Sequence, residues 1–155
     1  MTEGELQNSF AYFNSCYFGG RLNCKVVVTD DWIDGEGKYY PDSAVKLDAE
    51  SLMRGTAEGY SVRRATALYN HSKDLISIPR WMLAGEKATR ALLLHEMAHS
   101  AANEPETDHG PKWHKEMHRL WKAQAPINLQ DVTAGSTSHE LVTQYGVGSD
   151  FWEKV

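Results

Sequence analysis

The strongest constraint on the fold is one apolar segment, residues 86–103, which contains the sequence HEMAH at positions 95–99. The spacing of its apolar residues predicts an α-helix. Residues four apart lie on the same face of a helix, so we expect His95 and His99 to reach one metal ion. Polar side chains of this kind are costly to bury in an apolar helix unless they are paired or bind a metal. The segment therefore predicts a metal-binding helix.

The residue types in this helix indicate zinc and hydrolysis. Neutral imidazole nitrogens bind Zn²⁺ at about 2.0–2.1 Å. Glu96 projects from the adjoining helix face, where we expect it to reach a water activated by the metal and accept its proton. Zinc lowers the pKa of such a water from about 15.7 to about 7, which makes hydroxide available near neutral pH. The pattern predicts one catalytic Zn²⁺ as cofactor and Glu96 as the general base.

A catalytic zinc site also requires a third protein ligand and an open fourth position. The candidates downstream of the helix are His109, His114, His118, Asp108, Glu106 and Glu104. His109 is the best choice on local grounds, because it precedes a Gly-Pro pair at a helix start and a short loop over residues 100–108 can return it to the first helix. His114 is the next candidate, followed by His118.

Composition places the chain among ordinary soluble globular proteins. Its 155 residues suffice for one domain, and 41% of them are hydrophobic while 24% are charged. The formal net charge of −5 argues against a surface that binds nucleic acid throughout. The local basic candidates are Arg63-Arg64 and a series at helical spacing, which we interpret as a solvated helix face. That series is Lys112, Lys115, Arg119 and Lys122.

The cysteines and the N-terminus indicate the compartment. Cys16 and Cys24 lack the CxxC spacing of a zinc ribbon, so we expect two unpaired thiols in a reducing environment. Residues 1–10 have neither the basic nor the apolar part of a signal peptide. No apolar run approaches membrane-spanning length. We therefore expect a cytoplasmic protein without a membrane partner.

The other segments predict a mixed α and β domain. Helices are expected at 5–17, where apolar residues recur at helical spacing, and at 111–122, which begins with proline. Strands are expected at 24–29, 64–70 and 74–79, the last two joined as a hairpin.

The central and C-terminal parts of the chain carry weaker patterns. A Gly-rich turn is expected at 34–37 and a short helix at 43–54. From residue 123 the sequence becomes rich in Gly, Ser, Thr and Gln. We therefore expect the domain over residues 1–122, with 123–155 as an extension that packs on it or is loosely ordered.

Several motifs together resemble the SprT/Spartan metalloprotease family. HEMAH, a polar loop and DHGPKWHKEMHRL at 108–120 match its pattern of HEMxH followed by HGxxF or HGxxW and a helix. Upstream, residues 13–22 look like the first helix of the family and its FGGxL exit. Residues 75–78 resemble the edge strand before the active-site helix. The resemblance covers most of the chain.

The resemblance implies an α+β fold, a single small zincin-like domain. It has an N-terminal helix, a short and mostly antiparallel sheet of about three strands, the active-site helix and a following helix. By position, His95, His99 and His109 match the zinc ligands, and Glu96 matches the general base. This implies a zinc metalloendopeptidase with protein or peptide substrates, including DNA-associated proteins.

Other functions and supporting roles remain open in the sequence. The alternative function is a non-catalytic module in which zinc holds the C-terminal helices together and the domain binds protein or DNA. An intact Glu96 favours the enzyme, because a purely structural site does not need it. The candidates for stabilising an oxyanion are His114, His118, Arg119 and Tyr69. Asp108 and Glu116 are the candidates for orienting the ligating imidazoles.

Overall fold

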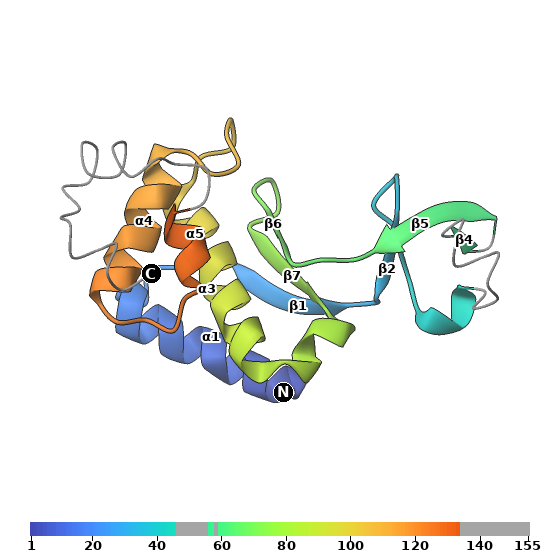
Figure 1. Ribbon diagram of the computed structural model, residues 1–155, viewed down its shortest axis with the longest axis horizontal. Helices are drawn as coiled ribbons and strands as arrows, with labels where there is room; N and C mark the ends of the chain where they lie inside the picture. Colours follow the sequence, from blue (N-terminus) through green and yellow to red (C-terminus); the bar gives the residue numbers. More distant parts are fainter. Residues whose placement is uncertain (46–55, 58, 134–155) are drawn as a thin grey trace.

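The computed structural model describes residues 1–45, 56–57 and 59–133, which form an α+β domain with the expected N-terminal helix and two small sheets. The helices α1, α3, α4 and α5 gather on one side, and the second sheet lies at the far end of the molecule (Figure 1). The predicted fold class is confirmed. No helix in the described ranges is long and apolar enough to cross a membrane.

The N-terminal helix and its exit form as the sequence predicts. Helix α1 spans Glu3–Phe18 and begins with a capping box, in which Thr2 and Glu5 exchange side-chain and backbone hydrogen bonds. It ends at Gly19, whose φ of 60° suits glycine. The Asn14 amide then donates to the Leu22 carbonyl at 3.0 Å and accepts from the Leu22 N–H at 3.1 Å, which fixes the turn into the first strand.

The main sheet has the order β1-β7-β6. Strand β1 (Lys25–Thr29) runs parallel to β7 (Leu75–Pro79), and β6 (Leu68–Asn70) pairs with β7 in the antiparallel sense. The hairpin between β6 and β7 is confirmed. Strand β7 is central and largely buried, so the expected edge strand at 75–78 is wrong, and β1 and β6 form the two edges of this sheet.

The second sheet was not predicted. Its order is β3-β2-β5-β4, with every pair antiparallel. The strands are β2 (Trp32–Asp34), β3 (Tyr39–Tyr40), β4 (Thr56–Ala57) and β5 (Tyr60–Arg64). The predicted turn at 34–37 joins β2 to β3. The Asp34 carboxylate stabilises this turn by accepting hydrogen bonds from the backbone N–H groups of Glu36 and Lys38.

One prediction in this part of the chain needs correction, and a second falls mostly outside the described residues. The strand expected at 64–70 is in fact the end of β5 and the separate strand β6, and residues 65–67 between them belong to neither. The helix expected at 43–54 falls mostly on residues 46–55, which lie outside the described residues. Its described start belongs to a single 3₁₀ turn, η1 (Asp42–Ala44).

The C-terminal half carries the helices that build the core. After the 3₁₀ turn η2 (Arg80–Ala84), α3 spans Glu86–Ala102, followed by α4 (Pro111–Lys122) and the short α5 (Leu129–Thr133). The predicted helices at 86–103 and 111–122 are confirmed.

Helix α3 lies at the centre of the core. Leu93, Leu94 and Met97 are fully buried there, and burial of such a side chain stabilises the fold by about 1.5–3 kcal/mol. At 3.6 residues per turn, fixing this face toward the core directs His95 and His99 to the opposite side. The packing of α3 therefore sets the orientation of the HEMAH segment.

Candidate metal centre

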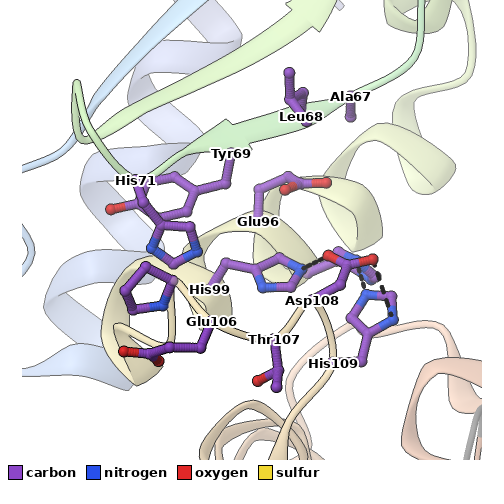
Figure 2. A pocket seen from close by; sticks show the side chains of 12 residues that line it. Ala67, Leu68, Tyr69, His71, Glu96, His99, Glu106, Thr107, Asp108 and His109 are labelled. Carbon is purple, nitrogen blue, oxygen red and sulfur yellow. Dashed lines mark hydrogen bonds and ion pairs between the residues drawn. The ribbon is translucent and has the colours of Figure 1, made fainter.

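Three imidazoles meet beside α3. One ring nitrogen from each of His95, His99 and His109 lies within 4.8 Å of the other two, and the described part of the chain holds no second group of this kind. The Nε2 atoms of His95 and His109 are 3.2 Å apart. The structure thus brings together the two helix histidines and the candidate favoured as third ligand. Figure 2 labels His99 and His109 at this site.

The loop between α3 and α4 delivers His109 to the cluster. Helix α3 ends at Asn103, which adopts a left-handed conformation with φ of 50°. The Glu104 carboxylate accepts a hydrogen bond from the Trp113 N–H at 2.8 Å and so caps the first turn of α4. A side chain at Gly110 would overlap Thr107 Oγ1 and Glu104 Oε2, so glycine permits this close turn. His109 therefore lies between Glu104, which caps α4, and Gly110, which permits the close turn.

Trp113 supports all three histidines from α4. It is fully buried, and its ring centroid lies 4.9, 5.4 and 4.2 Å from those of His95, His99 and His109. Its indole N–H also donates to the His95 carbonyl oxygen at 3.2 Å. Trp113 therefore packs against the whole histidine cluster.

The charge state of the histidines suits a metal. Burial, with repulsion from His95 and His109, lowers the pKa of His99 to about 4. Burial also lowers the pKa of His109. For His95, burial lowers the pKa, but the hydrogen bond to Asp131 and nearby carboxylates outweigh it, so the pKa is raised. Two of the three rings therefore stay neutral at pH 7 and keep a lone pair available for a cation.

Glu96 lies in the same cleft. Its side chain is buried with the residue only 6% exposed, and Figure 2 shows its carboxylate between His99 and the strand that carries Leu68. Burial raises the pKa of Glu96 to about 7. A carboxyl group with this pKa exchanges a proton with water near neutral pH.

The cleft has a volume of about 380 Å³ and is lined by residues 67–69, His71, the three histidines, Glu96 and the loop at 105–109. A second, larger hollow of about 990 Å³ borders His95 from the other side. There, side chains of α3 such as Leu92 face Ile127 and Leu129. Of the three histidines, only His95 lines this second hollow.

The other candidate ligands occupy different places. His114 and His118 are buried on α4 outside the cluster, and His118 stacks on Trp121 with centroids 5.7 Å apart. Glu104 caps α4, and Glu106 lines the cleft. Asp108 Oδ1 lies 3.8 Å from His99 Nε2, and the Asp108 side chain is 86% exposed.

Of the residues expected in supporting roles, some line the cleft and others lie away from it. The Arg119 guanidinium donates to the Glu116 carboxylate and to the Tyr17 carbonyl, so neither Arg119 nor Glu116 reaches the cluster. Tyr69 does line the cleft, but its hydroxyl donates to Asp74. Burial and this hydrogen bond raise the pKa of Tyr69 to about 12.

Sequence reasoning missed two residues at the site. Asp131 Oδ2 lies 3.0 Å from His95 Nδ1, and His71 in the β6–β7 turn lines the cleft. Asp131 belongs to a helix of five residues, which is too short to show an apolar period. His71 is an isolated histidine in a turn. Only the tertiary structure places either one beside the cluster.

Comparison with known proteins gives one match. A search of curated proteins found no significant relative, and a search of solved structures found none either. A family model described as the SprT-like family matches residues 6–134, which include α1, both sheets, the histidine cluster and α5. The chain therefore belongs to the SprT-like family and carries a metalloprotease-like domain with three histidines that can hold a metal ion.

Proposed function

We propose that this protein is a zinc-dependent metalloendopeptidase of the HExxH type, with His95, His99 and His109 as metal ligands and Glu96 as the general base. The observation that carries the proposal is the convergence of three imidazoles and one buried carboxyl group in a single cleft. A site with three protein ligands on one side and open space on the other is typical of catalytic rather than structural zinc.

The residues fit zinc in particular. Imidazole nitrogens are good zinc ligands, and the lowered pKa values of His99 and His109 leave those rings neutral when a metal arrives. A zinc ion held there would supply Lewis-acid chemistry and make hydroxide accessible near neutral pH. The cysteines that favour closed structural sites are absent from the cluster.

Glu96 supplies the proton transfer. Its carboxylate accepts the proton of the attacking water and carries it to the nitrogen of the leaving amine. Burial raises the pKa of Glu96 in the metal-free site, which favours its uptake of a proton. Glu96 lines the same cleft as the three histidines and is not part of the group that could hold the ion.

A protein or peptide substrate is supported by the strand beside the cleft. Strand β6 pairs only with β7 among the described strands, and Leu68 on it is 49% exposed. The free backbone groups of an edge strand can pair with an extended peptide, which would then run along the cleft past Glu96. The proposed substrate class is therefore an extended polypeptide, with DNA-associated proteins as one subclass.

The test is cleavage of a loosely folded protein such as casein by the zinc-loaded chain. Glu96→Gln should retain stoichiometric zinc and lose activity by about 10²–10⁴-fold. A chelator should abolish cleavage, and zinc should restore it. Adding single-stranded DNA to parallel reactions tests whether DNA acts as a partner.

The outcomes separate the enzyme from its alternative. A wild-type protein without stoichiometric zinc would overturn the proposal. Stoichiometric zinc without cleavage, with or without DNA, would instead support a non-catalytic module that binds protein or DNA. Full activity in Glu96→Gln would remove Glu96 from the role of general base.

A further inference from the structure

We propose that Asp131 is a positioning residue of the metal centre: its carboxylate holds the Nδ1–H of His95, so that Nε2 of the same ring faces the metal. The inference rests on the proposed zinc function. It also makes the short helix α5 a working part of the site, although α5 lies beyond α3, which carries His95 and His99, and beyond the α3–α4 loop, which carries His109.

The geometry of the pair supports this role. Asp131 Oδ2 is 3.0 Å from His95 Nδ1, within hydrogen-bonding distance, and the two side chains are only 21% and 16% exposed. With Nδ1 occupied, the second ring nitrogen is the one available to a metal. That atom, Nε2, faces His109 Nε2 at 3.2 Å. The hydrogen bond therefore selects the tautomer and the ring orientation that the cluster needs.

No other histidine of the cluster has an equivalent partner in the described part of the chain. Asp108 lies 3.8 Å from a ring nitrogen of His99 and of His109, which is too far for a hydrogen bond. Its side chain is 86% exposed. Asp131 is partly buried and hydrogen-bonded, so it is the carboxylate placed to orient a ligand.

The fold holds Asp131 in place through its neighbours. Val132 is only 1% exposed, and α5 packs against α4. Asn128 caps the helix, because its side chain accepts from the Gln130 N–H and its carbonyl accepts from the Asp131 N–H, both at 3.0 Å. The Asp131 side chain is thus presented to α3 from a backbone fixed on both sides.

The effect on metal binding should be measurable. Outer partners of this kind typically change metal affinity by about 10–100-fold when they are removed. Asp131→Ala should therefore bind zinc about 10–100-fold more weakly than wild type. Asp131→Asn should recover part of the loss, because its amide oxygen still accepts the Nδ1–H while the negative charge is gone.

The experiment is zinc competition against a chromogenic chelator for wild type, Asp131→Ala, Asp131→Asn and the control Gln130→Ala. Gln130 is exposed on the same helix, so its replacement tests α5 without touching His95. The melting temperatures of the metal-free proteins are measured in parallel. NMR of the zinc-loaded proteins reports the His95 Nδ1–H signal, which should be slow to exchange in wild type and fast in Asp131→Ala.

Each outcome decides the proposal. Equal zinc affinity in wild type and both Asp131 variants would overturn it while leaving the zinc function intact. Absence of zinc from wild type would instead remove the zinc function on which it rests. Equal weakening in Asp131→Asn and Asp131→Ala, with equally lowered metal-free melting temperatures, would also overturn it by showing a purely structural contact. If Asp131→Ala does not fold, the same comparison is made between Asp131→Asn and wild type.

Discussion

Helix α3 and the loop that follows it bring histidines to the same point by different means. On α3, the helical period places His95 and His99 on one face, and the buried residues of the opposite face fix that orientation. In the loop, His109 depends on the cap from Glu104 and on the close turn at Gly110. The exposed fractions follow this difference, because the side chain of His99 is 8% exposed and that of His109 is 36% exposed.

The difference shows that the helix half of the site is built by the core and the loop half by a few local contacts. A change on α3 should therefore act on the metal directly, whereas a change in the loop should act through the position of His109. Four substitutions test this contrast.

The largest expected effect is the loss of a histidine. His99→Ala and His109→Ala should each lower zinc affinity by more than the about 100-fold typical of an outer partner, because each removes a proposed metal ligand. The loss should be greater for His99→Ala, since His109→Ala leaves the helix pair intact. Competition with a chelator measures both, and His114→Ala serves as the control. Full affinity in His109→Ala together with loss in His114→Ala would reassign the third ligand.

The next effect concerns Glu96 and the pH dependence of stability in the metal-free protein. Its pKa rises from the ordinary 4.5 to about 7 on folding, so the folded state holds more protons between these values. The stability that Glu96 contributes is thus complete below about pH 4.5 and disappears as pH rises through 7. The stability that His99 contributes has the opposite pH dependence. The pKa of His99 falls to about 4 on folding, so this stability grows as pH rises to about 6.5.

Replacing Glu96 separates the two contributions. In Glu96→Gln the contribution of Glu96 is removed while those of the histidines remain, so the stability of the variant relative to wild type should rise by about 3 kcal/mol between pH 4.5 and 7. Urea unfolding with a chelator present measures the difference at each pH. A constant difference across this range would show that Glu96 titrates normally and would weaken its proposed role as base.

The smallest effect is expected from the loop. Glu104→Ala removes the cap of the first turn of α4, where Gly110 offers no side chain of its own. The free energy of unfolding should fall by about 1 kcal/mol, as is typical for a lost cap. Zinc affinity should fall by no more than about tenfold, which corresponds to about 1.4 kcal/mol. Glu106→Ala, in the same loop, is the matched control, and an equal effect there would contradict a specific role of the cap.

The sequence predicted the parts of the structure that repeat a period or end at a distinctive residue. Helix α3 was predicted from its apolar spacing, and α4 from the proline at its start. The turn after α1 was predicted from its glycines. The approach of His109 to the helix pair was expected from the short loop and the helix start, because these limit where the chain can go.

The second sheet could not be predicted in the same way. Strands β2, β3 and β4 have two or three residues each, too few to show alternation. Its junction with the main sheet depends instead on tertiary contacts. The Arg64 guanidinium lies 5.1 Å from the ring centres of both Trp32 and Trp81, which come from separate parts of the chain.

Asp131 was missed for a related reason. No spacing in the sequence connects it with His95, from which it is 36 residues distant. Its contact with the cluster results from the path of the chain after α4. Carboxylates that orient a ligand are therefore harder to find from sequence than the ligands themselves when they lie on a separate element.

The position of Trp113 gives the protein an optical probe of its own. Its indole ring lies within 5.4 Å of all three imidazole rings and is shielded from water. Any change in the charge on those rings, by protonation or by a cation, alters the electric field across the indole and hence its emission. Metal occupancy can thus be followed without a dye, and the Trp113→Phe variant provides the blank against the other four tryptophans of the chain.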